Sequence, residues 1–271
     1  MPEGHTIHRL ARDLNKDLAG HDVTASSPQG RFAAGAARLH GEKMVKADAW
    51  GKHLFCGFAS GQVLHIHLGL IGKFRRKKLP AAEPTDTVRL RLVGDVAAWD
   101  LTGPYLCAVI TDDDRQEVTA KLGPDPLRAT GARAVAAARE DFGARLARRR
   151  VAIGAALLDQ KIIAGIGNVY RAEILFLLGI DPRRPANSLD EAEVNAIWDL
   201  TSVHLGQGVR LNRIVTVDPA EAGVKSAGRL KRADALYAYK REGLPCRRCG
   251  AEIEIMKIAN RSMWACPMCQ K

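Results

Sequence analysis

Residues 1–20 of this 271-residue chain read MPEGHTIHRLARDLNKDLAG, and their pattern fixes the first element of the fold. Apolar side chains recur from Ile7 to Leu18 at the three- and four-residue spacing of one helix face, and Gly20 stands where such a helix would end. The pattern predicts a helix over residues 4–18. Packed along its apolar stripe, this helix would hold in place the residues just before it, although chain termini usually fray.

Pro2 and Glu3 precede the predicted helix and could form a reactive pair. Once Met1 is removed, Pro2 carries a secondary α-amine, and because unperturbed α-amines titrate at about 7.7–8.0, part of the population is unprotonated near neutral pH. A secondary amine that attacks an aldehyde or acetal carbon gives a charged iminium, which favours loss of a proton from the neighbouring carbon. Glu3 would serve as the acid and base beside it. The alternative is that these residues only begin a helix, since proline and an acid are both favoured there.

The composition indicates a polyanionic partner. The chain has 41 Lys and Arg against 30 Asp and Glu, a formal charge of +11 and a pI near 9.6, which favours nucleic acid. No apolar run approaches the roughly 20 residues of a membrane span, and nothing before Gly20 resembles a secretory signal. We therefore expect a cytoplasmic monomer. In that compartment the six cysteines favour metal binding or buried thiols over disulfides.

Residues 22–111 are rich in β-branched and alternating residues that are broken by turn signals, which predicts an antiparallel sandwich or barrel. In the segment VLHIHL, residues 63–68, the two leucines and Ile66 share one face of a strand and His65 and His67 share the other. Two histidines at that spacing could bind a metal. Because no acid or cysteine is close in the sequence, the polar face of a half-buried strand is the preferred interpretation.

Three features of this half suit a DNA surface. Lys52 lies in a predicted turn, where it could face a phosphate or simply be solvated. The tract KFRRKK, residues 73–78, combines five cations with one aromatic ring and fits contact with the DNA backbone better than base reading. Leu70 stands near Gly69 at a predicted loop tip, where it could anchor the core or wedge into a base stack.

The segment LGPDPL, residues 122–127, cannot continue a regular element and predicts a linker to a helical half. In the last of the helices beyond it, Ser188 and Glu191 would form a capping box. The basic stretch from Val224 to Arg232 lacks clear periodicity and is a candidate mobile loop. The helices are expected over residues 133–149, 153–159, 168–178 and 188–204.

The stretch DQKIIAGIGNVY, residues 159–170, is the most informative part of the helical half. Gly165 and Gly167 permit a tight double turn, after which Asn168 would cap a helix that ends at Gly179. Exposed amides at such a helix start could bind a phosphate. The alternative is a capped helix with a tight entry and no ligand.

The last thirty or so residues contain four cysteines in two CxxC pairs separated by sixteen residues. This spacing is typical of a zinc site with four thiolate ligands, held on a hairpin with Arg261 at its tip. Four thiolates leave no open coordination position, so the ion would hold structure rather than do chemistry. Cys56 and Cys107 lie outside the pattern, in apolar strands, and are expected to be core residues. The four expected ligands are Cys246, Cys249, Cys266 and Cys269.

Taken together, these stretches resemble the formamidopyrimidine-DNA glycosylase and endonuclease VIII family of base-excision repair enzymes. The resemblance covers essentially the whole chain, and its six motifs occur in the family's order. They are Met1-Pro2-Glu3-Gly4, Gly51-Lys52-His53-Leu54, His67-Leu68-Gly69-Leu70, residues 122–127, Gly165-Ile166-Gly167-Asn168-Val169-Tyr170 and the cysteine hairpin that ends at Gln270.

The resemblance implies an α+β chain with three domains: a β-sandwich with an N-terminal helix over residues 1–121, a helix-two-turn-helix domain over 122–235 and a zinc finger over 236–271. DNA would lie in the cleft between them. Pro2 would be the nucleophile and Glu3 its acid/base partner. The phosphates around an extruded nucleotide would be held by Lys52, Asn168 and Arg261.

The resemblance also implies the reaction, which is removal of an oxidised base followed by strand cleavage through β,δ-elimination. Gly4 looks more like the endonuclease VIII branch, because the formamidopyrimidine branch usually has leucine there, and this favours oxidised pyrimidines. The segment Asp100–Tyr105 departs from the formamidopyrimidine pattern, since it lacks the arginine and phenylalanine that read and fill the opposite strand. Two alternatives stay open: an enzyme for oxidised purines, and a damaged-DNA-binding zinc protein without catalysis.

Overall fold

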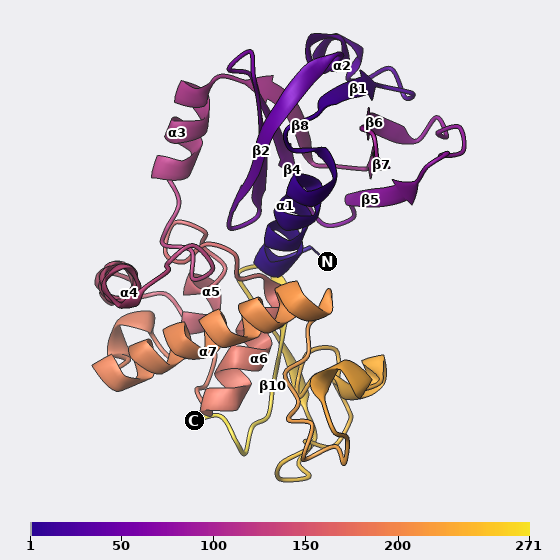
Figure 1. Ribbon diagram of the computed structural model, residues 1–271. Coiled ribbons are helices and arrows are strands. Elements are labelled where there is room, and N and C mark those ends of the chain that lie inside the picture. Colours follow the sequence, from indigo (N-terminus) through magenta and orange to yellow (C-terminus); the bar gives the residue numbers. More distant parts are fainter. Residues whose placement is uncertain (1) are drawn as a thin grey trace. The chain divides into compact units, whose positions relative to one another are not determined.

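The computed structural model describes residues 2–271, which divide into two compact units, one ending at Lys121 and the other beginning at Leu122 (Figure 1). The first unit contains a single antiparallel sheet of eight strands and three helices. Its elements are α1 (Gly4–Leu18), β1 (Asp22–Ser26), α2 (Ala33–Leu39), β2 (Glu42–Trp50), β3 (His53–Phe58), β4 (Val63–His67), β5 (Lys73–Lys78), β6 (Val88–Val93), β7 (Ala97–Thr102), β8 (Leu106–Ile110) and α3 (Asp112–Ala120).

The strands run in the order β5-β7-β6-β1-β2-β3-β4-β8, and β1 joins the two halves of the sheet. Residues 22–23 of β1 pair with β2, whereas residues 24–26 pair with β6. Side chains from both halves, including Leu64 and Leu92, belong to one buried apolar cluster. A sheet that turns at one strand and packs on itself in this way is the predicted sandwich, so the fold class is confirmed.

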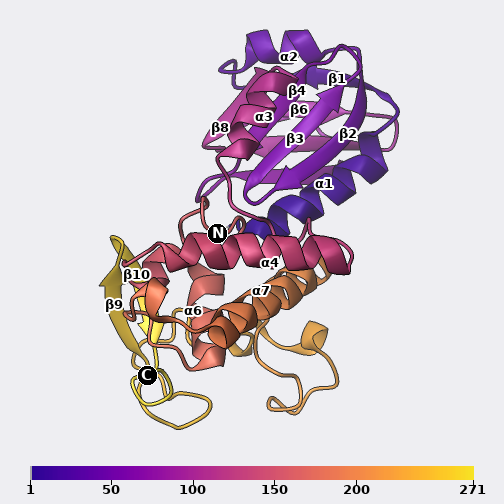
Figure 2. The same cartoon turned by 90° about the vertical axis from the view of Figure 1, so that its left-hand side faces the viewer.

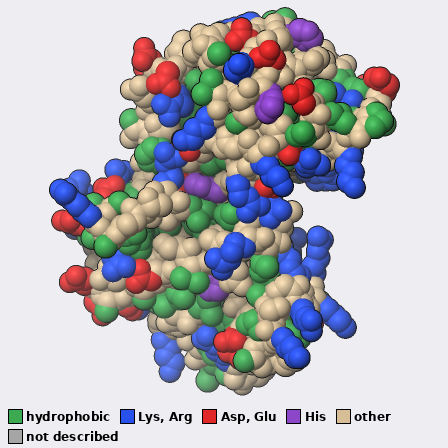
Figure 3. Space-filling model, viewed as in Figure 1, with side chains coloured by type: hydrophobic (Ala, Val, Ile, Leu, Met, Phe, Trp, Pro, Cys, Tyr) green, Lys and Arg blue, Asp and Glu red, His purple; other side chains and the backbone are tan. Residues whose placement is uncertain are grey.

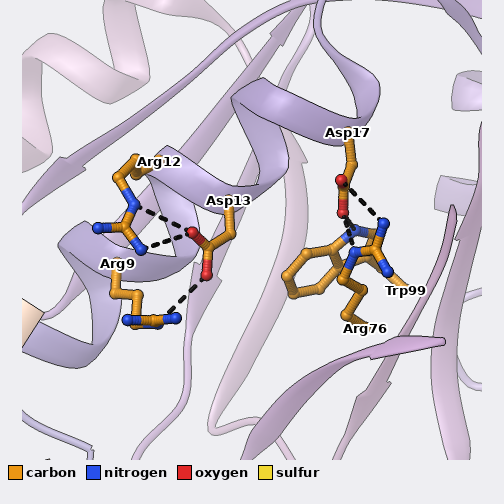
Figure 4. A network of polar contacts seen from close by, with 6 residues as sticks. All are labelled: Arg9, Arg12, Asp13, Asp17, Arg76 and Trp99. Atoms are coloured by element: carbon orange, nitrogen blue, oxygen red, sulfur yellow. Dashed lines mark hydrogen bonds and ion pairs between the residues drawn. The ribbon is translucent and has the colours of Figure 1, made fainter. Parts of the chain in front are cut away.

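The predicted first helix is confirmed as α1, whose apolar stripe lies in the core of the sandwich. At the far end of α1 the carboxylate of Asp17 is almost fully buried and accepts hydrogen bonds from Arg76 Nε at 2.7 Å and from Trp99 Nε1 at 3.0 Å. These bonds tie the helix to β5 and β7. Strand β5 is an edge strand, and Lys and Arg side chains gather on that edge of the unit (Figure 3), while the ties to Asp17 are drawn in Figure 4.

Two helices of this unit were not among the predicted elements. Helix α3 has no buried residue and no apolar periodicity, so the hydrophobic pattern could not indicate it. Its start is nevertheless well defined, because the Thr111 hydroxyl accepts from the Asp114 backbone N–H while the Asp114 carboxylate accepts from the Thr111 backbone N–H. Helix α2 is only seven residues long, which is shorter than the pattern can resolve.

The second unit is mainly helical and ends in a two-stranded hairpin (Figure 2). Its elements are α4 (Ala132–Ala147), α5 (Ile153–Ala156), α6 (Asn168–Leu178), the 3-10 turn η1 (Ala186–Ser188), α7 (Glu191–Leu211), the 3-10 turns η2 (Ala227–Arg229) and η3 (Arg232–Asp234), β9 (Glu254–Ile258) and β10 (Arg261–Ala265).

Helix α6 lies at the centre of this unit, with nine of its eleven residues buried and with α7 and β10 packed against it. It ends at Gly179, which adopts the left-handed conformation (φ 70°) as the sequence predicted. The predicted capping box of Ser188 and Glu191 is wrong. The box at the start of α7 is formed by Asp190 and Glu193, two residues later, because Ser188 belongs to the preceding 3-10 turn.

The hairpin belongs to the same compact unit as the helices, since Ile258 and Met263 pack in the helical core and Trp264 belongs to a second cluster together with Val215. The division of residues 122–235 and 236–271 into separate domains stays a prediction. None of the helices within residues 2–271 combines the length and apolar character that crossing a membrane requires.

Candidate functional site

Pro2 and Glu3 lie immediately before the first turn of α1. Glu3 is the N-cap residue in an extended conformation, and its backbone carbonyl accepts a hydrogen bond of 2.9 Å from the N–H of Thr6. Its side chain is completely buried, while Pro2 is half-buried. Because α1 is anchored in the core by Ile7 and the leucines that follow, the position of these two residues is fixed by packing. Met1, whose removal would free the Pro2 amine, lies outside the described residues.

Lys52 lies in the tight turn between β2 and β3, as the sequence predicted. The turn is closed by pairing of Trp50 with His53, and Gly51 has a φ of 55°, which favours glycine. Lys52 itself is half-exposed. The turn therefore presents the lysine at the end of two paired strands, which give it a rigid base.

Leu70 lies in the turn between β4 and β5 and is 60% exposed. Gly69 has a φ of 66°, and at Gly72 an added Cβ would lie 2.2 Å from the Leu68 carbonyl oxygen, so the tight shape of this turn requires both glycines. The neighbouring Ile71 is also exposed. An exposed apolar tip on a tight turn matches the predicted wedge, and an anchor in the core is excluded for Leu70.

The strand β5 that follows this turn displays most of its cations to solvent. Phe74 points into the core, and Arg76 pairs with Asp17, whose hydrogen bond raises the pKa of the Arg76 guanidinium. The other cations of the strand are exposed. One member of the predicted phosphate-contacting tract thus has a structural role, and the rest face outward.

The loop before α6 has the predicted tight form, but Asn168 is not its cap. Gly165 has a φ of 100°, and Gly167 is the N-cap residue, with no side chain to accept a hydrogen bond. Asn168 is the first residue of the helix and is buried, and its Nδ2 donates to the backbone carbonyl of Ser262 at 3.0 Å. The prediction of a helix cap was wrong because the side-chain amide of Asn168 forms a hydrogen bond with the carbonyl of Ser262, far away in the sequence, and not with the start of its own helix.

Ser262 follows Arg261 in the hairpin, so the structure brings Asn168 and Arg261 close together. Arg171 reinforces this contact by donating to the Ser262 carbonyl at 3.1 Å and to the Gly154 carbonyl at 2.7 Å. Arg261 begins β10, directly after the turn formed by residues 259–260, and is exposed. The first turn of α6 is thus bonded to the hairpin residue that follows Arg261.

Sequence reasoning missed Glu173, which is fully buried at the centre of α6. Its carboxylate accepts hydrogen bonds from three consecutive backbone N–H groups, those of residues 237–239, at 2.7–2.9 Å, and from the Thr216 hydroxyl. These bonds fix both ends of the segment between Thr216 and Tyr237, which contains the predicted loop from Val224 to Arg232. The lone acid of a mostly apolar helix was the signal that could have found it.

The four predicted zinc ligands form one cluster. Their Sγ atoms all lie within 4.8 Å of one another, with Cys246 and Cys269 3.8 Å apart and Cys249 and Cys266 3.4 Å apart. A tetrahedral zinc ion with bonds of about 2.3 Å places its sulfurs roughly 3.8 Å apart, so these residues fit the ion. Among the described residues this is the one cluster of three or more His, Cys, Asp or Glu suited to a metal.

The remaining two cysteines lie in the sandwich. Cys56 is fully buried, and burial raises the pKa of its thiol to about 12, so it stays protonated. Cys107 is partly buried against the same core, and burial likewise raises its pKa to about 12. Neither thiol is suited to act as a nucleophile at neutral pH.

Comparison with known proteins gives a consistent result along the chain. Residues 1–102 match the family described as formamidopyrimidine-DNA glycosylase N-terminal domain, and residues 122–218 match the formamidopyrimidine-DNA glycosylase H2TH domain. The chain is 44% identical over 276 residues to "Endonuclease 8 1" of Mycobacterium tuberculosis, covering 100% of both chains. It is 30% identical to the formamidopyrimidine-DNA glycosylase of Latilactobacillus sakei, covering 100% of this chain and 98% of the other.

Solved structures show the same fold. The MutM (Fpg) protein of Thermus thermophilus matches with a TM-score of 0.78 at 28% identity, covering 99% of this chain and 98% of that one. Fpg of Lactococcus lactis, in a complex with DNA that contains an abasic site, matches with a TM-score of 0.78 at 24% identity over 99% of each chain.

Proposed function

Because this chain belongs to the formamidopyrimidine-DNA glycosylase and endonuclease VIII family, we propose that it is a bifunctional DNA glycosylase and abasic-site lyase of base-excision repair. The observation that carries the proposal is the position of Pro2 and Glu3, held directly before a helix whose apolar stripe lies in the core. A reactive amine at a chain end needs such anchoring, because a frayed terminus would not meet one carbon atom reproducibly.

In this proposal the Pro2 nitrogen attacks C1′ of the damaged nucleotide. The new N–C1′ bond replaces the bond to the base, which leaves with a proton, and opening of the sugar gives an iminium at C1′. The iminium withdraws electrons from the neighbouring carbon, so a proton is lost there and the 3′ phosphate departs. A second elimination releases the 5′ phosphate. Glu3 is the group placed to transfer protons in these steps.

The other predicted residues hold the DNA. Lys52 in the β2–β3 turn, and Asn168 with Arg261 in the second unit, bind phosphates around the extruded nucleotide, because stacked sugars and bases are inaccessible to chemistry. Leu70, exposed on its tight turn, fills the space that the nucleotide leaves. The four-cysteine cluster would hold one zinc ion, which stabilises the hairpin that carries Arg261.

Oxidised pyrimidines are the proposed substrates. The support is the higher identity to "Endonuclease 8 1", 44% against 30% for the formamidopyrimidine enzyme, together with Gly4 at the start of α1. Residues 100–105 depart from the formamidopyrimidine pattern in the segment that contacts the DNA strand opposite the lesion in that branch. Asp100 is occupied by a buried ion pair with Arg91, and Tyr105 is the exposed side chain of that turn, so selectivity for the opposite base should differ from the formamidopyrimidine pattern.

Excision from a panel of duplexes tests the substrate. Duplexes containing thymine glycol, dihydrouracil or 8-oxoguanine should be cut with a clear preference for the two pyrimidines by protein with a native N-terminus. Preference for 8-oxoguanine would contradict the pyrimidine assignment but leave the reaction intact. Binding of all three duplexes without any excision would favour the alternative of a non-catalytic damage-binding protein.

A further inference from the structure

Three histidines gather on the face of the sheet that lies opposite the core. His53 pairs directly with His67 across β3 and β4, and His65 lies two residues earlier on β4. The Nδ1 of His53 and the Nε2 of His65 are 2.9 Å apart, which is a hydrogen bond. Since the alternate residues Leu54 and Ile66 belong to the core, the three imidazoles form a polar cluster on the outer face, as the alternation of β4 predicted for two of them.

Neighbouring rings and α3 enclose this histidine cluster. Phe55 stacks on His65 with ring centroids 4.6 Å apart, and Tyr105 meets His67 edge-on at 5.7 Å. Helix α3 packs against β4 and lies in front of the sheet in Figure 2. His65 is only 3% exposed, so no DNA group can reach it, whereas His53 is half-exposed.

The cluster is uncharged at neutral pH. Burial, followed by repulsion from His67, His65 and Lys52, lowers the pKa of His53 to about 3. Burial and His67 lower the pKa of His65 to about 4, and burial and Lys52 lower that of His67. The charged groups nearby are Lys52 on the adjacent turn, and Asp48 on β2 with Arg115 on α3, which attract each other. Each imidazole thus carries one N–H and one acceptor nitrogen.

One hydrogen bond fixes the position of the His67 proton, and the direction of the bond between His65 and His53 decides that of the His53 proton. The backbone N–H of Gly69 donates to His67 Nδ1 at 3.1 Å, so the proton of His67 lies on its Nε2. If His65 donates through Nε2 to His53 Nδ1, the proton of His53 must lie on its Nε2, on the opposite side of the ring from the shared bond. The Nε2–H of His53 is then available to an acceptor beside Lys52, which His53 follows directly in the sequence.

We propose that His53 is a further phosphate-binding residue beside Lys52, and that His65 is the positioning residue that fixes its tautomer and ring direction. The proposal rests on the proposed function, since it takes the Lys52 turn to bind a DNA phosphate. His53 supplies a neutral donor and Lys52 a charge. A neutral donor displaces no counterion, so its loss weakens binding without changing the dependence on salt.

The test is binding of a duplex with a tetrahydrofuran abasic-site analogue across a salt series. His53→Ala should raise Kd about tenfold, the usual worth of a hydrogen bond to a charged group, with the salt slope unchanged. His65→Phe keeps a ring against Phe55 but removes the donor to His53, so it should weaken binding similarly. The double variant should bind no more weakly than the singles, because both remove one contact.

Lys52→Ala is the comparison that separates this inference from the proposed function. It should lower the salt slope by about 0.9, as expected for one lost phosphate contact. If Lys52→Ala changes nothing, the phosphate site itself is wrong. If Lys52→Ala behaves as expected and His53→Ala binds like the native protein, the role of His53 is overturned. His40→Phe, which removes the exposed histidine at the C-cap of α2, is the control for loss of an imidazole elsewhere in the same unit.

The tautomer gives a readout that a purely structural role of His65 would not move. In protein with ¹⁵N-labelled histidine, the His53 ring should carry its proton on Nε2. In His65→Phe this preference should be lost, while the melting temperature of the zinc-loaded protein stays close to that of the native protein. A His53 ring protonated on Nδ1 in the native protein would overturn the assignment of His65.

Discussion

The side-chain amide of Asn168 donates a hydrogen bond of 3.0 Å to the backbone carbonyl of Ser262, ninety-four residues later in the chain. Arg171, on the next turn of α6, donates to the same carbonyl. The hairpin residue beside the predicted phosphate clamp Arg261 is therefore held by the start of a buried helix. A short hairpin has little core of its own, and this contact fixes the place from which Arg261 projects.

The first prediction concerns this contact. Asn168→Ala should lower the free energy of unfolding by about 1 kcal/mol, because the Ser262 carbonyl loses one of its two side-chain donors and keeps Arg171. It should also lower the salt slope of DNA binding, as Arg261→Ala does, since the clamp is displaced. Ser262→Ala is the matched control, because it keeps the backbone carbonyl and should leave both quantities near native. Calorimetry and the salt series measure them, and a native salt slope in Asn168→Ala would separate Asn168 from Arg261.

The second prediction compares two aspartates of α1 that Figure 4 shows in two separate groups of polar contacts. Asp17→Ala leaves the buried Trp99 N–H without an acceptor and should lower the free energy of unfolding by about 2–3 kcal/mol. Asp13 pairs with Arg9 and Arg12 nearer the surface, and Asp13→Ala should cost no more than about 0.5 kcal/mol. Denaturant unfolding measures both. Equal costs would show that burial does not set the strength of this network.

Much of this fold could be predicted because its patterns are regular. Helix α1 and the two CxxC pairs each follow from spacing alone. The alternation of β4 predicted which side chains share a face, but the expected half-buried strand was wrong, because the histidine face is covered as well and His65 is buried. The actual role of Asn168 could not be predicted, because the carbonyl that accepts its side-chain hydrogen bond lies on β10 and no local pattern contains that distance.

The same limit explains the other differences. Helix α3 is stabilised by its capping box and a surface ion pair instead of by burial. Its sequence therefore has no apolar periodicity from which a helix could be predicted. The hydrogen bonds of Glu173 run to backbone groups more than sixty residues away. The partner of His53 is likewise set by strand register, which fixes neighbours that the sequence order does not show.

The third prediction concerns the metal. Cys249→Ser, or a strong chelator, should release zinc, unfold the hairpin and weaken DNA binding, because metal binding and folding of such a site are coupled. Cys107→Ser is the control, since that thiol lies in the sandwich and outside the cluster. Zinc content by atomic absorption and Kd for an abasic-site duplex provide the readouts. Native affinity in fully zinc-free protein would contradict the structural role.

The fourth prediction is acid destabilisation through the buried imidazoles. The pKa of His5 is lowered to about 4, mainly by burial, and that of His65 is lowered to about 4. Unfolded histidines titrate near 6.5, so between about pH 4 and 6.5 the unfolded chain binds more protons than the native one. Stability from these groups is therefore complete above about pH 7 and falls as pH is lowered through that window, by at most about 1.4 kcal/mol per imidazole and pH unit.

Unfolding of the native protein and of His65→Phe, followed from pH 4 to 8, checks this sign. The variant should lose part of the pH dependence, because it has one titrating ring fewer. A free energy of unfolding that rises as pH falls from 7 to 5 would show that the imidazoles are charged in the folded protein.

The most direct test of the account is covalent trapping on DNA. Borohydride added to the protein with a native N-terminus and a duplex carrying an oxidised pyrimidine should reduce the iminium to a stable protein–DNA adduct, and mass spectrometry of the digest should map it to Pro2. Pro2→Gly, which retains only a primary amine, should trap far more slowly, and a residue left in front of Pro2 should abolish trapping because the amine becomes an amide. An adduct that forms at the native rate in Pro2→Gly and maps to another residue would contradict the assignment of Pro2 as the nucleophile.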